Sequence, residues 1–94
     1  MTDNPVELFA KVHGRVQGVF FRATVERFAK EMGIRGFVEN KADGTVEIVA
    51  QGTKQDLEML IHRIQEHPGE AEIDSMNTNF REIAAPLTGF KVKR

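Results

Sequence analysis

The sequence of 94 residues contains no cysteine, no tryptophan and no tyrosine. Without cysteine it can form no disulfide, no thiolate-bound metal site and no thiol nucleophile, which excludes zinc-finger and thioredoxin-like proteins. A chain of this length can bury a core large enough to fold without such cross-links, but it is too short for two folds. The length therefore predicts one domain over residues 1–94.

A large net charge and long apolar runs are also missing. The formal net charge is −1, with 13 Lys and Arg against 14 Asp and Glu, so no long-range field attracts a polyanion. No apolar run approaches the length that spans a bilayer, and residues 1–5 are polar, unlike a secretory leader. We therefore expect a cytoplasmic monomer with no membrane partner and no nucleic-acid partner.

Histidine and carboxylate residues form no cluster with the spacing of metal ligands, so we expect no metal and no cofactor. The three histidines are interpreted as surface residues and not as catalytic groups. His13 falls on the strand face opposite Val12, and His62 and His67 lie on or just beyond the second predicted helix.

Hydrophobic periodicity predicts two helices and five strands. The first helix begins near Arg22 and ends at Gly33, a C-capping residue. The second opens with Thr53 and Asp56 in capping-box spacing and stops at residues 67–69. The predicted strands cover residues 6–13, 34–40, 45–51, 71–80 (with a bulge) and 90–93, with a hairpin turn at residues 41–44.

The order of these elements is strand, helix, strand, strand, helix, strand, followed by a short C-terminal strand. This order predicts an α+β, ferredoxin-like fold, in which two helices pack on one face of an antiparallel sheet of four to five strands. The same layout serves enzymes, metal carriers and RNA-binding domains, so the fold alone does not give the function.

The segment between the first strand and the first helix is the most informative part of the chain. Gly14 and Gly18 bracket a short loop, where glycine lets the backbone bend and approach a ligand closely. The helix that follows adds unpaired N–H groups and the positive end of its dipole. Arg22 adds a planar charged group that can bind two phosphate oxygens. The segment predicts a site for a small phosphate-containing ligand.

Glycines at such a junction can also be turn residues without a ligand. The run Val19-Phe20-Phe21 favours the binding site, because apolar side chains would anchor the loop in the core and keep it rigid. The loop lacks the Gly-Lys-Ser/Thr ending of a Walker A sequence, so a nucleoside triphosphate is not the expected ligand.

Two motifs resemble those of the acylphosphatase family, whose members hydrolyse the mixed anhydride of a carboxylate and phosphate. The matching residues of the first motif are Gly14, Val16, Gln17, Gly18, Val19, Phe21 and Arg22. The second motif is Gly36-Phe37-Val38-Glu39-Asn40, and it continues through Gly44, Val46 and Gly52. The second half of the chain matches only in length, element order and apolar pattern.

The resemblance implies an acylphosphatase that acts on a small acyl phosphate without a metal, with Arg22 binding the phosphate and Asn40 positioning the attacking water. Inorganic phosphate would be the product and an inhibitor. The backbone N–H groups expected to hold the phosphate together with Arg22 belong to six consecutive residues: Arg15, Val16, Gln17, Gly18, Val19 and Phe20.

One departure from the family and two alternative functions stay open. Glu39 stands where the family usually has a basic or neutral residue, although strand alternation places it on the face opposite Asn40. The first alternative is an idle acylphosphatase-like module that binds a small phosphate or a protein partner, similar to the modules at the start of hydrogenase-maturation proteins. The second is an RNA binder, since Arg35-Gly36-Phe37 begins like an RNP1 sequence, but the later aromatic residues are missing.

Overall fold

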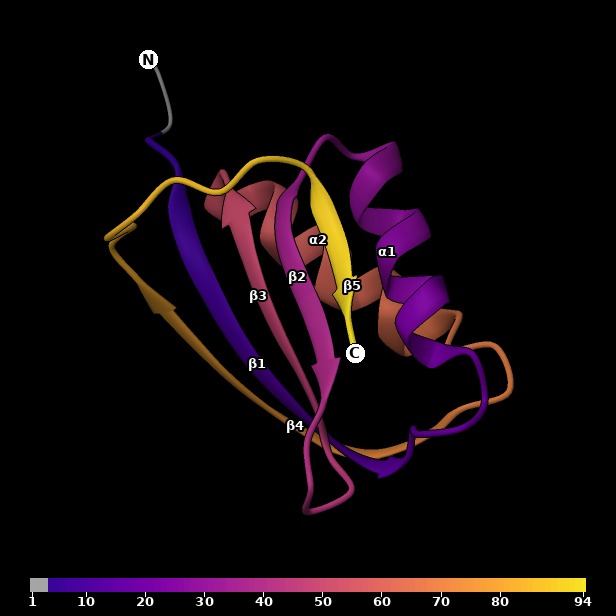
Figure 1. Cartoon of the computed structure of the whole chain (residues 1–94). Helices are drawn as coiled ribbons and strands as arrows, with labels where there is room; N and C mark the ends of the chain where they lie inside the picture. The colour runs from indigo at the N-terminus through magenta and orange to yellow at the C-terminus, as the bar shows by residue number, and fades with distance from the viewer. Residues whose placement is uncertain (1–3) are drawn as a thin grey trace.

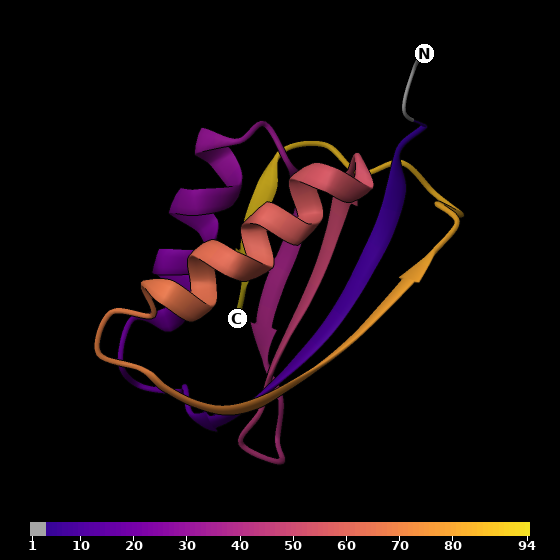
Figure 2. The same cartoon turned by 180° about the vertical axis from the view of Figure 1, so that it is seen from behind.

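The computed structural model describes residues 4–94 and consists of a five-stranded sheet with two helices on one face (Figure 1). The opposite face, which is turned toward the viewer in Figure 1, carries no helix and is called the open face below; Figure 2 shows the two helices in front of the sheet. The predicted order of elements and the α+β, ferredoxin-like fold class are confirmed. The elements are β1 (Val6–Arg15), α1 (Phe21–Glu31), β2 (Arg35–Asn40), β3 (Val46–Gly52), α2 (Lys54–Glu66), β4 (Glu72–Arg81) and β5 (Phe90–Lys93).

The strands lie in the order β4-β1-β3-β2-β5. The pairs β1–β3, β1–β4 and β2–β3 are antiparallel, but β5 pairs with β2 in parallel. The chain after β4 crosses the end of the sheet at which β4 finishes, and β5 then runs back in the opposite direction (Figure 1). The sheet is therefore mixed, which corrects the prediction of an antiparallel sheet at this one strand.

The core lies between the sheet and the helices. In β1, Leu8, Ala10 and Val12 alternate with residues of the open face and are completely or almost completely buried. The helices contribute Val25, Phe28 and Ala29 from α1, and Leu57, Leu60 and Ile64 from α2, at the spacing of one helix face. Met32 and Ile61 are only partly buried against this cluster. No helix within residues 4–94 is long and apolar enough to cross a membrane.

The predicted cap of α1 at Gly33 is confirmed. The N–H of Gly33 donates to the carbonyl of Lys30 at 3.2 Å, and the N–H of Ile34 donates to the carbonyl of Ala29 at 2.9 Å. These two bonds form a Schellman motif, which requires the positive φ of 69° that glycine adopts easily. The motif turns the chain directly from α1 into β2.

The predicted bulge in the fourth strand is also confirmed. His13 pairs with Ser75 but Gly14 pairs with Ile73, so Asp74 is the extra residue on β4. A bulge increases the local twist and bends the strands that it joins. It lies where β1 leaves the sheet for the glycine loop.

A hydrogen-bonded network on the open face holds the segment between β4 and β5. Glu7, only 9% exposed, accepts from Gln51 Nε2 at 2.7 Å and from Arg81 Nε at 2.6 Å. Gln51 also donates to the carbonyl of Ala85 and accepts from the N–H of Leu87. Burial raises the pKa of Glu7, but the bonds from Gln51 and Arg81 and the charge of Arg81 lower it further, to below its ordinary value. The network therefore fixes the chain that leads into β5.

Candidate functional site

The loop between β1 and α1 depends on its two glycines. Gly14 has φ of 132°, and a Cβ atom there would overlap the carbonyl oxygen of Glu72 on β4. Gly18 has φ of 74° with open space around it, so its requirement is conformational and not steric. The two glycines let the chain leave the bulged end of β1 and turn into α1.

Apolar side chains of the loop and of the first residue of α1 pack into the hydrophobic core and hold the loop in place. Val16 and Phe21 are each 1% exposed, and Val19 packs partly against the core. The prediction that the run Val19-Phe20-Phe21 anchors the loop is therefore correct for two of its residues and wrong for Phe20, which is 80% exposed. The reason is the backbone: Phe20 has the left-handed φ of 61°, which turns its ring away from the core. Sequence reasoning did not identify Val16 as an anchor.

Gln17 fixes the loop to the β2–β3 hairpin. Its Nε2 donates to the carbonyl of Lys41 at 2.8 Å and to the carbonyl of Thr45 at 2.9 Å. Lys41 directly follows Asn40, the residue that the sequence places in the site. The side chain of Gln17 therefore joins the two motifs of the sequence, which come from separate segments of the chain.

The backbone of the loop offers free hydrogen-bond donors. The N–H groups of residues 16–20 donate to no other group within residues 4–94. α1 begins directly after them with no side-chain N-cap and with no acidic residue in its first turn. The positive end of the helix dipole is thus not neutralised by the protein, and such an arrangement binds an anion.

Arg22 and Asn40 line the same pocket, which has a volume of about 780 Å³. Arg22 lies in the first turn of α1, and its Nη1 donates to the carbonyl of Lys93 on β5 at 2.7 Å. Asn40 is exposed at the end of β2. Arg22 therefore gives the pocket a permanently charged donor, and Asn40 gives it a neutral amide, which can both donate and accept.

Three of the predicted loop residues, Val16, Gly18 and Phe20, also line this pocket. Arg15, Gln17 and Val19 do not line it. The Arg15 guanidinium instead contacts the carbonyl of Glu70 and the carboxylate of Glu72, each at 3.1 Å. The backbone roles predicted for these three residues stay predictions.

The hairpin that carries Asn40 is held by a short network. The Oδ1 atom of Asp43 accepts from the hydroxyl of Thr45 at 2.6 Å and from its N–H at 3.0 Å. Lys11 Nζ lies 3.0 Å from Asp43 Oδ2. The hydrogen bonds from the Thr45 hydroxyl and N–H, together with that from Lys11, lower the pKa of Asp43 well below its ordinary range.

Glu39, the departure from the family pattern, does not line the pocket. Its carboxylate Oε1 lies 3.7 Å from Lys41 Nζ. As predicted from strand alternation, Glu39 and Asn40 project to opposite faces of β2. Its charge is therefore partly balanced and lies away from the anion-binding loop.

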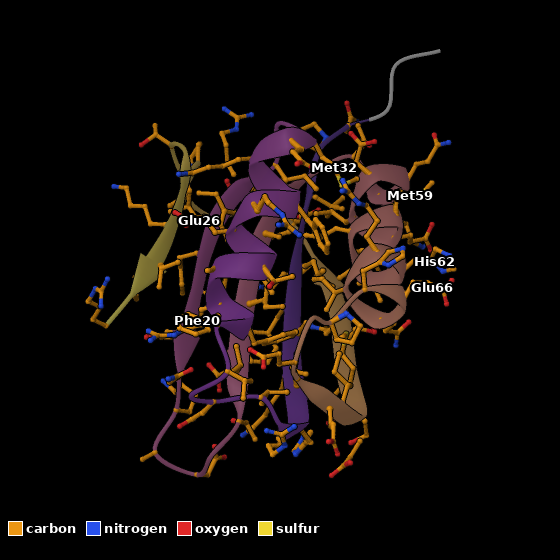
Figure 3. All side chains as sticks on the ribbon, turned by 90° about the vertical axis from the view of Figure 1, so that its right-hand side faces the viewer. Phe20, Glu26, Met32, Met59, His62 and Glu66 are labelled. Atoms are coloured by element: carbon orange, nitrogen blue, oxygen red, sulfur yellow. The ribbon has the colours of Figure 1, made fainter. Side chains whose placement is uncertain are left out.

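The histidines lie away from the pocket. His13 Nε2 is 3.0 Å from Asn77 Oδ1 across the β1–β4 pair. His62 lies on the outer surface of α2 (Figure 3). Within residues 4–94, no group of three or more potential metal ligands is present.

Sequence reasoning missed the part of the pocket between α1 and β5. Glu26 and Lys30 line it from α1, and they follow Arg22 at i+4 and i+8. That helical spacing is a signal from which they could have been found. The contributions of β5 had no such signal, because its pairing with β2 joins distant segments. The pocket residues that were not predicted are Phe21, Ala23, Glu26, Lys30, Phe90, Lys91, Val92 and Arg94.

Comparisons with known proteins cover nearly the whole chain. The family model described as Acylphosphatase matches residues 8–92. A curated acylphosphatase from Thermus thermophilus is 42% identical over 85 residues, which cover 90% of this chain and 96% of the relative. The crystal structure of acylphosphatase from Bacillus subtilis superposes with a TM-score of 0.90 at 26% identity, covering 95% of this chain and 99% of that one.

One further structure is that of a longer protein. Full-length HypF, in a crystal structure of its phosphate- and nucleotide-bound form, matches with a TM-score of 0.87 at 25% identity. The match covers 100% of this chain and 12% of HypF. The glycine loop and the asparagine hairpin of this chain both lie within the residues that the family model matches.

Proposed function

The chain belongs to the acylphosphatase family, whose activity is the hydrolysis of acyl phosphates, and on that premise we propose that the loop of residues 14–20, Arg22 and Asn40 form its active site. The observation that carries the proposal is their convergence. A loop with free N–H groups, an arginine and an asparagine come from two separate motifs and line one pocket.

In this proposal Arg22 and the loop N–H groups bind the phosphoryl group. Its three non-bridging oxygens carry the negative charge, and charge-assisted bonds from a guanidinium are stronger than neutral ones. In phosphoryl transfer the protein contributes mainly positioning and stabilisation of charge. Donors that are already in place stabilise the transition state without reorganising. Because Arg22 and the loop supply this stabilisation, we expect turnover without a metal.

Asn40 holds the attacking water through its amide. The water oxygen attacks phosphorus, the bond between phosphorus and the acyl oxygen breaks, and its electron pair leaves on the carboxylate. The proton of the water is released to solvent, and the products are a carboxylate and inorganic phosphate. The conjugate acid of the leaving group has a pKa of about 4, so no general acid is needed to protonate it.

Inorganic phosphate fits the same donors, and we propose that it inhibits competitively. The monomeric state and the cytoplasmic location expected from the sequence stay predictions. Sedimentation equilibrium tests the first, and fractionation of the source cells tests the second.

The alternative is a module that binds a phosphate without turnover. The match with HypF favours it, because there the same fold forms a small part of a longer chain. The presence of both Arg22 and Asn40 in one pocket favours hydrolysis.

Hydrolysis of benzoyl phosphate in excess EDTA tests the proposal, with Arg22→Ala and the control Arg27→Ala. Arg27 lies on the same helix but does not line the pocket. Each lost charge-assisted bond contributes about 1.5–3 kcal/mol, so Arg22→Ala should lower kcat/KM by about a thousandfold, and Arg27→Ala should retain wild-type turnover. Turnover in folded Arg22→Ala equal to wild type would refute the assignment of the site. No turnover in folded wild type would support the binding module.

A further inference from the structure

Phe20 combines two unfavourable features. The residue is 80% exposed, more than any other large hydrophobic residue within residues 4–94. Its φ of 61° is the only positive φ of a non-glycine residue in the same part of the chain. A bulky residue in this region is an outlier, and an exposed ring forgoes the free energy of burial. Glycine would avoid both penalties.

The position of Phe20 offers a functional reason for these two unfavourable features. Residues that carry backbone strain gather at functional sites, and Phe20 immediately precedes α1 and lines the pocket together with Arg22. Figure 3 shows Phe20 at the start of α1 and Glu26 farther along the helix, both on the side that faces β5. The ring thus stands at the junction between the phosphate loop and the rest of the pocket.

The pocket is larger than a phosphate needs. Its volume of about 780 Å³ lies within the range of about 300–1,000 Å³ that holds a drug-sized ligand. Beyond Arg22 it is lined by the apolar residues Ala23, Phe90 and Val92 and by the cationic residues Lys91 and Arg94. Glu26 and Lys30, which also line it, form an ion pair with Nζ and Oε2 3.1 Å apart. This space therefore offers apolar surface, bordered by the Glu26–Lys30 ion pair and by two further cationic side chains.

We propose that Phe20 and this apolar part of the pocket form the acyl subsite, and that it favours acyl phosphates with a large apolar acyl group, above all an aromatic one. The inference rests on the function proposed above, because the phosphate must lie in the loop for the acyl group to reach the ring. Aromatic rings pack favourably in offset or edge-to-face pairs. Phe20 is a specificity-determining residue here, since its ring contacts the acyl group and not the reacting phosphorus.

The test compares kcat/KM for benzoyl phosphate and acetyl phosphate in wild type, Phe20→Ala and Phe20→Tyr. The readout is the benzoyl-to-acetyl ratio, because any effect on the phosphate loop and the different reactivity of the two anhydrides cancel when ratios are compared between variants. Phe20→Ala should lower the ratio by about five- to tenfold, and Phe20→Tyr should restore it. Met59→Ala is the control, since Met59 is the other large exposed hydrophobic residue and lies on α2, outside the pocket.

Stability supplies a second readout. Phe20→Gly removes the strained φ and the exposed ring, so its midpoint of denaturation should rise while its benzoyl-to-acetyl ratio falls. A lower midpoint with an unchanged ratio would show that the ring is structural, and would overturn the proposal.

The two proposals fail in different ways. If wild type hydrolyses neither substrate, the proposed function fails, and the acyl subsite fails with it. If both substrates are hydrolysed and Phe20→Ala keeps the wild-type ratio, only the acyl subsite is refuted.

Discussion

The two helices begin in opposite ways. At α2, the Thr53 hydroxyl accepts from the N–H of Asp56 at 3.1 Å, and Asp56 places a carboxylate in the first turn. Both features stabilise a helix start. At α1, the preceding residue is the strained Phe20 with no capping side chain, and the first turn carries Arg22 and no acid. Residues of α2 itself satisfy the N-terminus of that helix. The N-terminus of α1 has no such group, and in the function proposed above it binds the phosphate of the substrate.

The start of α1 is nevertheless held in place. Its support comes from the loop before it, through buried Val16 and through the bonds of Gln17 to the hairpin. At α2, one hydroxyl both satisfies a donor and fixes the turn. At α1 the backbone is instead held by Val16 and by the hydrogen bonds of Gln17, neither of which occupies the N–H groups at the start of the helix. These donors therefore stay free.

Among the variants that test this contrast between the two helices, Asn40→Ala is expected to have the largest effect, because it separates the catalytic step from anion binding at α1. Asn40→Ala should lower kcat by about a hundredfold, the usual effect of removing one polar group that acts in the transition state. Its inhibition constant for inorganic phosphate should change by less than about threefold, because the proposed role of Asn40 is on water. Steady-state kinetics with phosphate as inhibitor measures both. Asn79→Ala, on β4, is the control. Equal losses in kcat and phosphate affinity would instead make Asn40 part of the phosphate site.

The second prediction removes the support of α1. Gln17→Met keeps the length of the side chain but loses both hydrogen bonds, so the free energy of unfolding should fall by about 1–2 kcal/mol. kcat should fall by about tenfold, because small displacements of positioning groups slow the reaction. Denaturant unfolding and kinetics measure the two effects, with Gln65→Met on the exposed surface of α2 as control.

A double variant shows whether Gln17 acts through Asn40. If the hairpin is the link, Gln17→Met should lower kcat much less in the Asn40→Ala background than in wild type. Full additivity of the two effects would contradict this link and leave Gln17 with a role in the loop alone.

The third prediction introduces an acidic residue into the first turn of α1, where α2 has Asp56. Ala23→Glu places a carboxylate in the first turn of α1, within the pocket. It should stabilise the helix by about 0.3–1 kcal/mol and weaken inhibition by phosphate by roughly five- to tenfold, because the two anions repel. Thermal unfolding and inhibition kinetics should therefore move in opposite directions. The neutral variant Ala23→Gln separates charge from size, and an equal loss of phosphate affinity in it would show that bulk is the cause.

Much of this comparison could be predicted from sequence, because the signals are local. The glycine loop, Arg22 and the Thr53–Asp56 cap each depend on residues only a few positions apart. The direction of β5 and the part of the pocket between α1 and β5 could not be predicted, because they depend on contacts between segments that are far apart in the sequence. The outward ring of Phe20 was missed for another reason: apolar patterning predicts burial, whereas its backbone conformation turns it away from the core.

The smallest effect is expected at α2 and completes the contrast. Thr53→Ala removes the cap and should lower the free energy of unfolding by about 1 kcal/mol, whereas Thr53→Ser, which keeps the hydroxyl oxygen, should stay close to wild type. Neither change should alter kcat/KM, because Thr53 does not line the pocket. Urea unfolding and benzoyl phosphate turnover of the same preparations measure the two properties. If Thr53→Ala lowers turnover in proportion to stability, the two helix starts are not independent, and the division between a stabilised α2 and an open α1 is wrong. An unchanged turnover at reduced stability is the result expected if only α1 serves the ligand.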